Sequence, residues 1–273
     1  MYELSVAVLS LLLMIGSFWG GLAVQRFLRD VHRSRESVES IRVLITLLVT
    51  FAALVLGLLI SSSQARFSAS EASLRGLSIQ ITELDQRLRE YGSAADPLRV
   101  ELIRYTKAAI ADTWPDEPAP PGNYPRHLSR VGDSELESAE LGALLTQIDM
   151  AIRHLTPDNS FQSSIAASLR TRMVALLDQR WNLIVNAEPS LSWPFVAILV
   201  FWLGVIFVIA GLSSPRNLLV FTVTMLATVS LASSIFLALE LDTPVTGFIA
   251  LSSTSLRNAL LHITLPPLPG GAS

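Results

Sequence analysis

The stretch VLITLLVTFAALVLGLLISSSQA, residues 43–65, contains no ionisable side chain and lies between Arg42 and Arg66. An α-helix needs about 20 apolar residues to cross roughly 30 Å of hydrocarbon, so this stretch predicts a transmembrane helix. Three further stretches meet the same criterion: residues 4–25, 193–213 and 217–239. The sequence therefore predicts an all-α membrane protein with four transmembrane helices.

The composition agrees with this class. Hydrophobic residues make up 51% of the 273 residues and charged residues only 16%, which favours a chain that resides in the lipid bilayer. The formal net charge of −3 argues against a nucleic-acid partner, which would require a basic surface. There is no cysteine, so disulfides, thiol catalysis and cysteine-bound metals are excluded.

The first apolar stretch could instead be a secretory signal peptide, but its flanks argue against that alternative. Only three residues precede it, and none of them is basic, whereas a signal peptide begins with a basic segment. The apolar run is also too long, and its end at Val24-Gln25 offers no small-residue cleavage site. We therefore interpret residues 4–25 as the first transmembrane span.

Apolar residues continue beyond the second span with a 3-4-3-4-3 spacing, which is typical of a coiled-coil seam. They are Leu74, Leu77, Ile81, Leu84, Leu88 and Tyr91. Since no helix breaker separates them from the second span, we expect one continuous helix that ends at Gly92. It begins a charged segment, residues 66–188, which we interpret as a helical bundle domain inserted between the second and third spans.

Caps and helix breakers divide this segment further. Asp96-Pro97 predicts the start of a second helix. The proline-rich run that begins at Trp114 predicts an exposed loop as far as about Arg130. Ser134-Glu135-Leu136-Glu137 is a capping box, so it predicts the start of a third helix.

The last helix of the bundle can be capped by Asp158 or Asn159. We expect it to run directly into the third span, with Pro189 and Pro194 at the membrane entry. The short connection SSPRN, residues 213–217, predicts a tight antiparallel hairpin of the third and fourth spans. The predicted domains are residues 1–65 (first pair of transmembrane helices), 66–188 (helical bundle), 189–239 (second transmembrane hairpin) and 240–273 (a tail with a short helix capped by Thr254 or Ser255 and a disordered Pro/Gly-rich end).

Arginines gather in the connection between the first two spans, at Arg26, Arg29, Arg33, Arg35 and Arg42. The positive-inside rule places such a connection in the cytoplasm. Both termini and the inserted bundle would then be extracytoplasmic, in a multi-pass protein of the cell membrane. The asymmetry is incomplete, because other arginines flank the membrane on the opposite side: Arg66, Arg75, Arg170, Arg172 and Arg180.

Signatures of enzymes and of cofactor sites are missing. The sequence has no GxxxxGK[ST] loop, no HExxH and no GxSxG motif. His32 and Glu36 could share a helix face, but two ligands do not make a metal site, and a solvated face explains them. We therefore predict no enzyme, no cofactor and no metal. No ionisable residue lies within a span, which disfavours proton-coupled transport but permits a passive channel for small ions.

Small and hydroxyl-bearing residues recur along the spans. In the second span they have a 4-3-4-4 spacing and share one helix face: Thr46, Thr50, Ala53, Gly57 and Ser61. Close helix packing accounts for such a stripe, and the alternative is that the stripe lines a pore in a homo-oligomer. In the first span, Gly16 and Gly20 form a GxxxG motif, which predicts close helix packing.

Glu240, Asp242 and Arg257 are the candidate functional polar residues. The two acidic residues lie where the fourth span leaves the bilayer and could ring a pore mouth. Alternatively, they cap the helix end and tie down the tail with Arg257. This alternative has a physical reason, because acidic residues at a helix C-terminus oppose the macrodipole and require a compensating partner.

Two motifs in the second half are the most specific, Pro215-Arg216-Asn217 and Glu240-Leu241-Asp242-Thr243-Pro244. Through them the chain resembles the bacterial bestrophin-like domain family over about residues 40–262. Further matching elements are Gly57-Leu58-Leu59-Ile60-Ser61, Leu84-Asp85, Tyr91-Gly92, Trp114-Pro115, Trp193-Pro194, Phe201-Trp202-Leu203 and Leu256-Arg257-Asn258-Ala259-Leu260. The resemblance implies a multi-pass protein of a bacterial inner membrane.

Bestrophins are pentameric chloride channels with four spans in each subunit. Their termini and large intervening region lie in the cytoplasm, which is opposite to the orientation that the charge rule predicts here. Two hypotheses follow for this chain. It is an oligomeric bestrophin-like ion channel, with anions as the permeant ions, or it is a non-catalytic membrane scaffold or sensor whose helical domain binds a partner.

Overall fold

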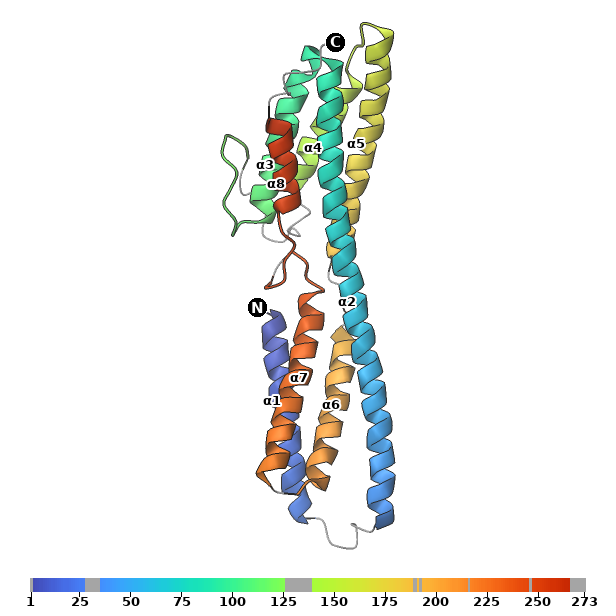
Figure 1. Ribbon diagram of the computed structural model, residues 1–273, viewed down its shortest axis with the longest axis vertical. Helices are drawn as coiled ribbons and strands as arrows, with labels where there is room; N and C mark the ends of the chain where they lie inside the picture. Colours follow the sequence, from blue (N-terminus) through green and yellow to red (C-terminus); the bar gives the residue numbers. More distant parts are fainter. Residues whose placement is uncertain are drawn as a thin grey trace. The chain divides into compact units, whose positions relative to one another are not determined.

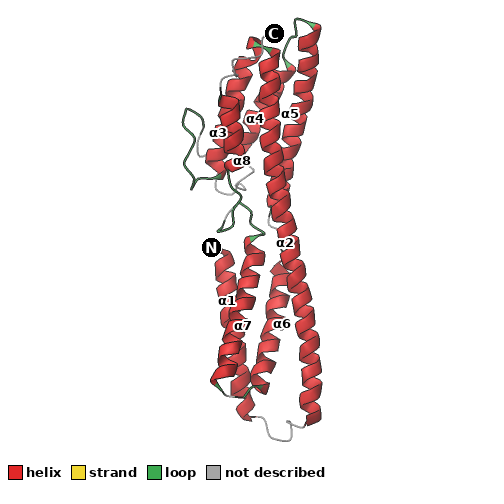
Figure 2. Cartoon of the chain, viewed as in Figure 1, coloured by secondary structure: helices red, strands yellow, loops and turns green. Residues whose placement is uncertain are grey.

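The computed structural model describes residues 2–27, 35–125, 139–188, 191, 193–215, 217–245 and 247–265. Within these ranges every regular element is a helix and no strand occurs (Figure 2). The predicted all-helical class is therefore confirmed. The chain separates into two compact units: Met1–Phe67 with Pro189–Ile249, called here the membrane unit, and Ser68–Glu188 with Ala250–Ser273, called here the helical unit.

The membrane unit holds the four predicted spans (Figure 1). Its elements are α1 (Tyr2–Val24), the short 3₁₀ helix η1 (Gln25–Phe27), the first part of α2 (Arg35–Tyr91), α6 (Trp193–Ser213) and α7 (Leu218–Glu240). Each of the four α-helices is long and apolar enough to cross a membrane. Asn217 caps α7, because its side-chain oxygen accepts a hydrogen bond from the Val220 N–H at 2.8 Å.

Two glycines set the close approach of α1 and α6. A Cβ atom added to Gly21 would overlap the Val208 carbonyl oxygen, and one added to Gly211 would overlap the Phe18 carbonyl oxygen. The predicted motif does not perform this role, since an added Cβ on Gly16 or Gly20 meets no atom within 4 Å. Within the chain, α1 therefore packs against α6 through the helix face that carries Gly21. A contact of Gly16 and Gly20 with another copy of the chain stays a prediction.

The helical unit contains the rest of α2, the 3₁₀ helix η3 (Ser93–Ala95), α3 (Asp96–Thr113), α4 (Ala139–Arg153), α5 (Ser160–Ala187) and α8 (Thr254–Thr264). All six residues of the predicted seam, from Leu74 to Tyr91, are buried. The helix α2 is continuous as predicted, and it ends before Gly92, whose φ of +105° favours glycine. The Asn159 side chain caps α5 by accepting a hydrogen bond from the Gln162 N–H.

One predicted connection is wrong. The helix α5 does not run into the third span, because it ends at Ala187 and α6 begins at Trp193. Glu188 has extended backbone angles (φ −65°, ψ 130°). It precedes Pro189, and the proline ring disfavours helical angles in the residue before it.

Three further predictions concern the start of α8, the loop after α3 and two segments near residues 134 and 266. The helix α8 begins at Thr254 with Ser253 as its N-cap, so the predicted caps, Thr254 and Ser255, lie one and two residues too late. The predicted loop is irregular from Trp114 to residue 125. The capping box at residues 134–137 and the Pro/Gly-rich end after residue 265 lie outside the described residues.

We predict that Gly211→Ala destabilises the membrane unit by about 1–3 kcal/mol, because the new methyl group overlaps the backbone of α1. Thermal unfolding of the purified protein in detergent measures this. Gly20→Ala is the matched control, since its methyl group meets no atom within 4 Å and alanine favours the helix. Equal midpoints for the two variants would contradict the assignment of the α1–α6 contact.

Candidate functional site

The part of α2 in the membrane unit has one face packed against its own chain. Ala52, Leu56 and Ser63 are buried there. Ala52 and Leu56 belong to the apolar core of the unit, together with residues of α1, α6 and α7 such as Phe18, Leu199 and Ile235. This packed face fixes the rotation of α2, and it therefore decides which residues are left on the outside of the chain.

The predicted pore-lining residues all lie on that outside. Thr46, Thr50, Ala53, Gly57 and Ser61 are exposed, and we call this face the small-residue stripe. The hydroxyls of Thr46 and Thr50 donate to the carbonyl oxygens one turn earlier, of Arg42 at 2.9 Å and of Thr46 at 2.8 Å. Their protons are thus satisfied within the helix, as is usual for threonine in a membrane helix.

A second outer face lies beside the stripe and differs from it in side-chain size. Its members each follow a stripe residue by one position: Leu47, Phe51, Leu54 and Leu58. All four are exposed large hydrophobic residues, and we call them the bulky face. Successive residues of an α-helix are rotated by about 100°, so the two faces look in different directions. The segment thus presents a packed, a small and a bulky side.

Glu240 and Asp242 are buried at the end of α7, where they are only 1% and 6% exposed. Glu240 Oε1 accepts hydrogen bonds from the backbone N–H groups of Phe248 and Ile249. Gly247 makes this possible, since its φ is +113° and any Cβ would overlap the Glu240 carboxylate. The turn after α7 is therefore folded around the Glu240 side chain.

Asp242 connects this turn to the beginning of the third span. Its Oδ2 accepts a hydrogen bond from the Leu191 N–H at 2.9 Å. Both carboxylates are thus engaged with backbone donors of the membrane unit, which supply the compensation that the C-terminal end of α7 requires. The role of the two carboxylates at a pore mouth stays a prediction.

Arg257 has partners other than those expected for it. Its guanidinium group lies 3.0 Å from Glu117 Oε2 and donates to the Pro118 carbonyl oxygen at 2.9 Å. Ser253 also donates to Glu117. Partial burial acts to raise the pKa of Glu117, but the hydrogen bonds from Ser253 and Arg257 outweigh it, so this pKa lies below its ordinary value. Arg257 therefore ties α8 to the segment after α3.

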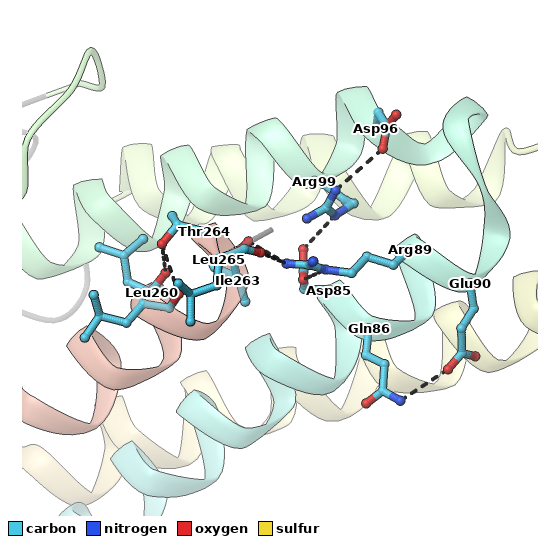
Figure 3. A network of polar contacts seen from close by, with 11 residues as sticks. Asp85, Gln86, Arg89, Glu90, Asp96, Arg99, Leu260, Ile263, Thr264 and Leu265 are labelled. Carbon is cyan, nitrogen blue, oxygen red and sulfur yellow. Dashed lines mark hydrogen bonds and ion pairs between the residues drawn. The ribbon is translucent and has the colours of Figure 1, made fainter. Parts of the chain in front are cut away.

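The sequence reasoning assigned no role to an ion-pair cluster around Asp85, shown in Figure 3. Asp85 is only 3% exposed, and its two oxygens accept from Arg89 at 2.6 Å and from Arg99 at 2.9 Å. Arg89 also donates to the carbonyl oxygens of Ile263 and Leu265 at the C-terminal end of α8, at 2.9 and 3.0 Å. The cluster thus joins α2, α3 and α8.

A sequence signal for this cluster existed. Asp85 directly follows the seam residue Leu84, and Arg89 lies one helical turn further on. An acidic residue beside a buried seam, with arginine at i+4, predicts an ion pair. It does not predict the contacts with Arg99 and α8, which depend on the tertiary fold.

The fold and these sites define an all-helical membrane protein with four spans. The sequence profile of the bestrophin-like domain matches residues 12–256. The chain belongs to the bestrophin-like family, so the resemblance inferred from its motifs is confirmed.

Solved structures have the same fold. Two single-residue variants of a bacterial bestrophin homologue from Klebsiella pneumoniae match with TM-scores of 0.63 and 0.65 and identities of 16% and 15%. Each match covers 96% of this chain, and 99% and 97% of theirs. A crystal structure described as a membrane protein matches with a TM-score of 0.63 and 15% identity, over 97% of this chain and 100% of its own. No curated protein matches the chain.

We predict that Asp85→Asn destabilises the helical unit by about 2–4 kcal/mol, because it leaves two partly buried arginines without a carboxylate. Chemical denaturation followed by circular dichroism measures the effect. Glu71→Gln is the matched control on the same helix, since its pair with Arg75 is exposed and worth at most about 1 kcal/mol. A loss for Asp85→Asn no larger than that of the control would show that the cluster does not hold α8.

Proposed function

We propose that the chain forms an oligomeric ion channel in which the small-residue stripe of α2 lines the pore. The observation that carries the proposal is the position of the stripe, whose five residues are all exposed, while a different side of α2 is packed in the core. A face of small and hydroxyl-bearing residues leaves room and oxygen atoms for passing ions. Membership of the bestrophin-like family supports the same function.

The stripe lies on the outer surface of a single chain, so one chain cannot enclose a path with it. Several copies related by a rotation axis would place their stripes around a common centre. The bulky face would then contact lipid or a neighbouring copy, for which large apolar side chains are suited. The proposed unit of function is therefore a homo-oligomeric ring, and its stoichiometry by native mass spectrometry in nanodiscs is the first test.

The chemistry of the stripe bears on which ions pass. It carries no charged side chain, and the Thr46 and Thr50 protons are engaged with backbone carbonyl oxygens. The hydroxyl oxygens thus offer lone pairs, and an anion would require each hydroxyl to rotate away from its carbonyl partner. The resemblance to bestrophins favours anions. Flux assays should therefore compare chloride with potassium on the same liposomes.

We predict that Thr50→Leu and Gly57→Leu abolish ion flux or reduce it at least tenfold in proteoliposomes, because each places a bulky side chain in the proposed pore. An added Cβ on Gly57 meets no atom within 4 Å, so a side chain can start there without overlapping the subunit. Leu54→Ala, on the bulky face, is the control and should leave the flux near its original value. If only Leu54→Ala changes the flux, the bulky face and not the stripe lines the pore. If none of the three variants changes the flux, the second span does not line the pore.

The alternative function is a non-catalytic scaffold or sensor whose helical unit binds a partner. Exposed apolar residues on α5 favour it, namely Val174, Trp181 and Val185. They recur at spacings of seven and four along one side of the helix, which is typical of a face that packs against another helix. A clean monomer or dimer in nanodiscs, without flux, would favour this function over the channel.

The orientation of the helical unit is a further part of the proposal, and the charge rule predicts that it is extracytoplasmic. The absence of cysteine gives a background-free test by single-cysteine labelling. We predict that a membrane-impermeant maleimide labels Thr156→Cys in intact cells, and labels Ser213→Cys, at the end of α6, only after permeabilisation. Both positions are exposed. The reverse pattern would place the unit in the cytoplasm, as the resemblance to bestrophins implies.

A further inference from the structure

Three large apolar grooves run between the helices of the membrane unit. Two of them, of about 580 and 540 Å³, are lined without any charged side chain. The third, of about 480 Å³, lies between the end of α1 and the start of α7 and includes Arg26. Among these three described grooves, this one alone combines an apolar surface with a cation. We call it the Arg26 groove.

Arg26 lies in η1, directly after the first span, and its side chain is exposed. No hydrogen bond or ion pair joins its side chain to another described residue. The neighbouring Gln25 is engaged, since its amide donates to the carbonyl oxygens of Leu212 and Ser214 at 3.2 and 3.1 Å. The N-terminal turn of α7 is likewise capped by Asn217. Among the described residues that line the groove, the guanidinium of Arg26 is therefore the free positive group.

Aromatic side chains line the groove one to two helical turns deeper. Trp19 and Phe221 meet edge to face with ring centroids 6.0 Å apart, and Trp19 remains 54% exposed. Arg26 follows Trp19 by seven positions, which corresponds to about 10 Å along a helix. Tryptophan favours the boundary between headgroups and acyl chains. Arg26 would accordingly lie at the depth of the lipid headgroups.

We propose that the Arg26 groove binds one anionic phospholipid. Its phosphate would pair with the Arg26 guanidinium, which matches phosphate oxygens with two N–H donors, and an acyl chain would follow Trp19 and Phe221 along the groove. Charge complementarity distinguishes this occupant from a neutral lipid, because each arginine near the surface favours an anionic headgroup about fivefold. This site is independent of the proposed channel, since the stripe of α2 lines no part of it.

The test is native mass spectrometry of the full-length protein, after exchange into detergent with equal amounts of phosphatidylglycerol and phosphatidylcholine. The unmodified protein should retain phosphatidylglycerol preferentially, and Arg26→Gln should weaken that retention about fivefold without changing the retention of phosphatidylcholine. Arg42→Gln is the matched control, because Arg42 is also exposed at a predicted membrane boundary but lines none of the three grooves. It should behave as the unmodified protein.

Two further variants keep the test decisive if Arg26→Gln folds poorly. Arg26→Lys keeps the charge and should keep the preference for phosphatidylglycerol. Ala23→Leu fills the groove, because Ala23 lines it and is exposed, and it should lower the retention of both lipids.

Three outcomes would overturn the proposal. The first is equal retention of the two lipids by the unmodified protein. The second is an equal loss for Arg42→Gln and Arg26→Gln, which would indicate a diffuse surface charge. The third is an oligomer that retains no lipid, which would indicate that a second copy covers the groove. Inorganic phosphate added in excess should not displace the lipid, since it has no acyl chain to hold it, and displacement would assign the site to free phosphate instead.

Discussion

In the hydrocarbon of a bilayer no water is available to the backbone, so every N–H and C=O group must be satisfied inside its own segment. This constraint makes the four spans helical, and the helices must then pack without backbone hydrogen bonds between them. The contact of α1 with α6 meets the requirement with Gly21 and Gly211, whose missing side chains let the two backbones approach. That pair, with the apolar core around Phe18 and Leu56, holds the membrane unit together.

The packing on one side of α2 has a consequence for its other sides. Ala52 and Leu56 lie in the apolar core, and the residues of the small-residue stripe lie outside it. The stripe and the bulky face therefore belong to the outside of the chain, where only lipid, ions or another copy can meet them. The packing of Ala52 and Leu56 in the core thus separates the side of α2 that stabilises the subunit from the sides that are proposed to act in an assembly.

The sequence predicted what depends on local rules and missed what depends on distant contacts. Charge-free stretches gave the four spans, and the 3-4 spacing gave the buried seam that ends at Gly92, because hydrophobic periodicity and backbone preferences are local. GxxxG spacing could not show that Gly21, next to Gly20, meets α6. Likewise Arg257 has its partner Glu117 far along the chain, and no pattern around either residue indicates the pair. The end of α5 was predictable, since Glu188 precedes a proline.

The burial of Glu240 and Asp242 limits how the proposed channel could select ions. Each carboxylate accepts hydrogen bonds from backbone N–H groups, and Glu240 is enclosed by the turn at Gly247, so exposing it to a pore would require that turn to unfold. A ring of these two acids at a pore mouth would also repel anions. The stripe itself is uncharged. Selectivity in such a channel would therefore arise from the pore width at the stripe and from the orientation of its hydroxyl groups. A pore of this kind would discriminate least between ions of similar size.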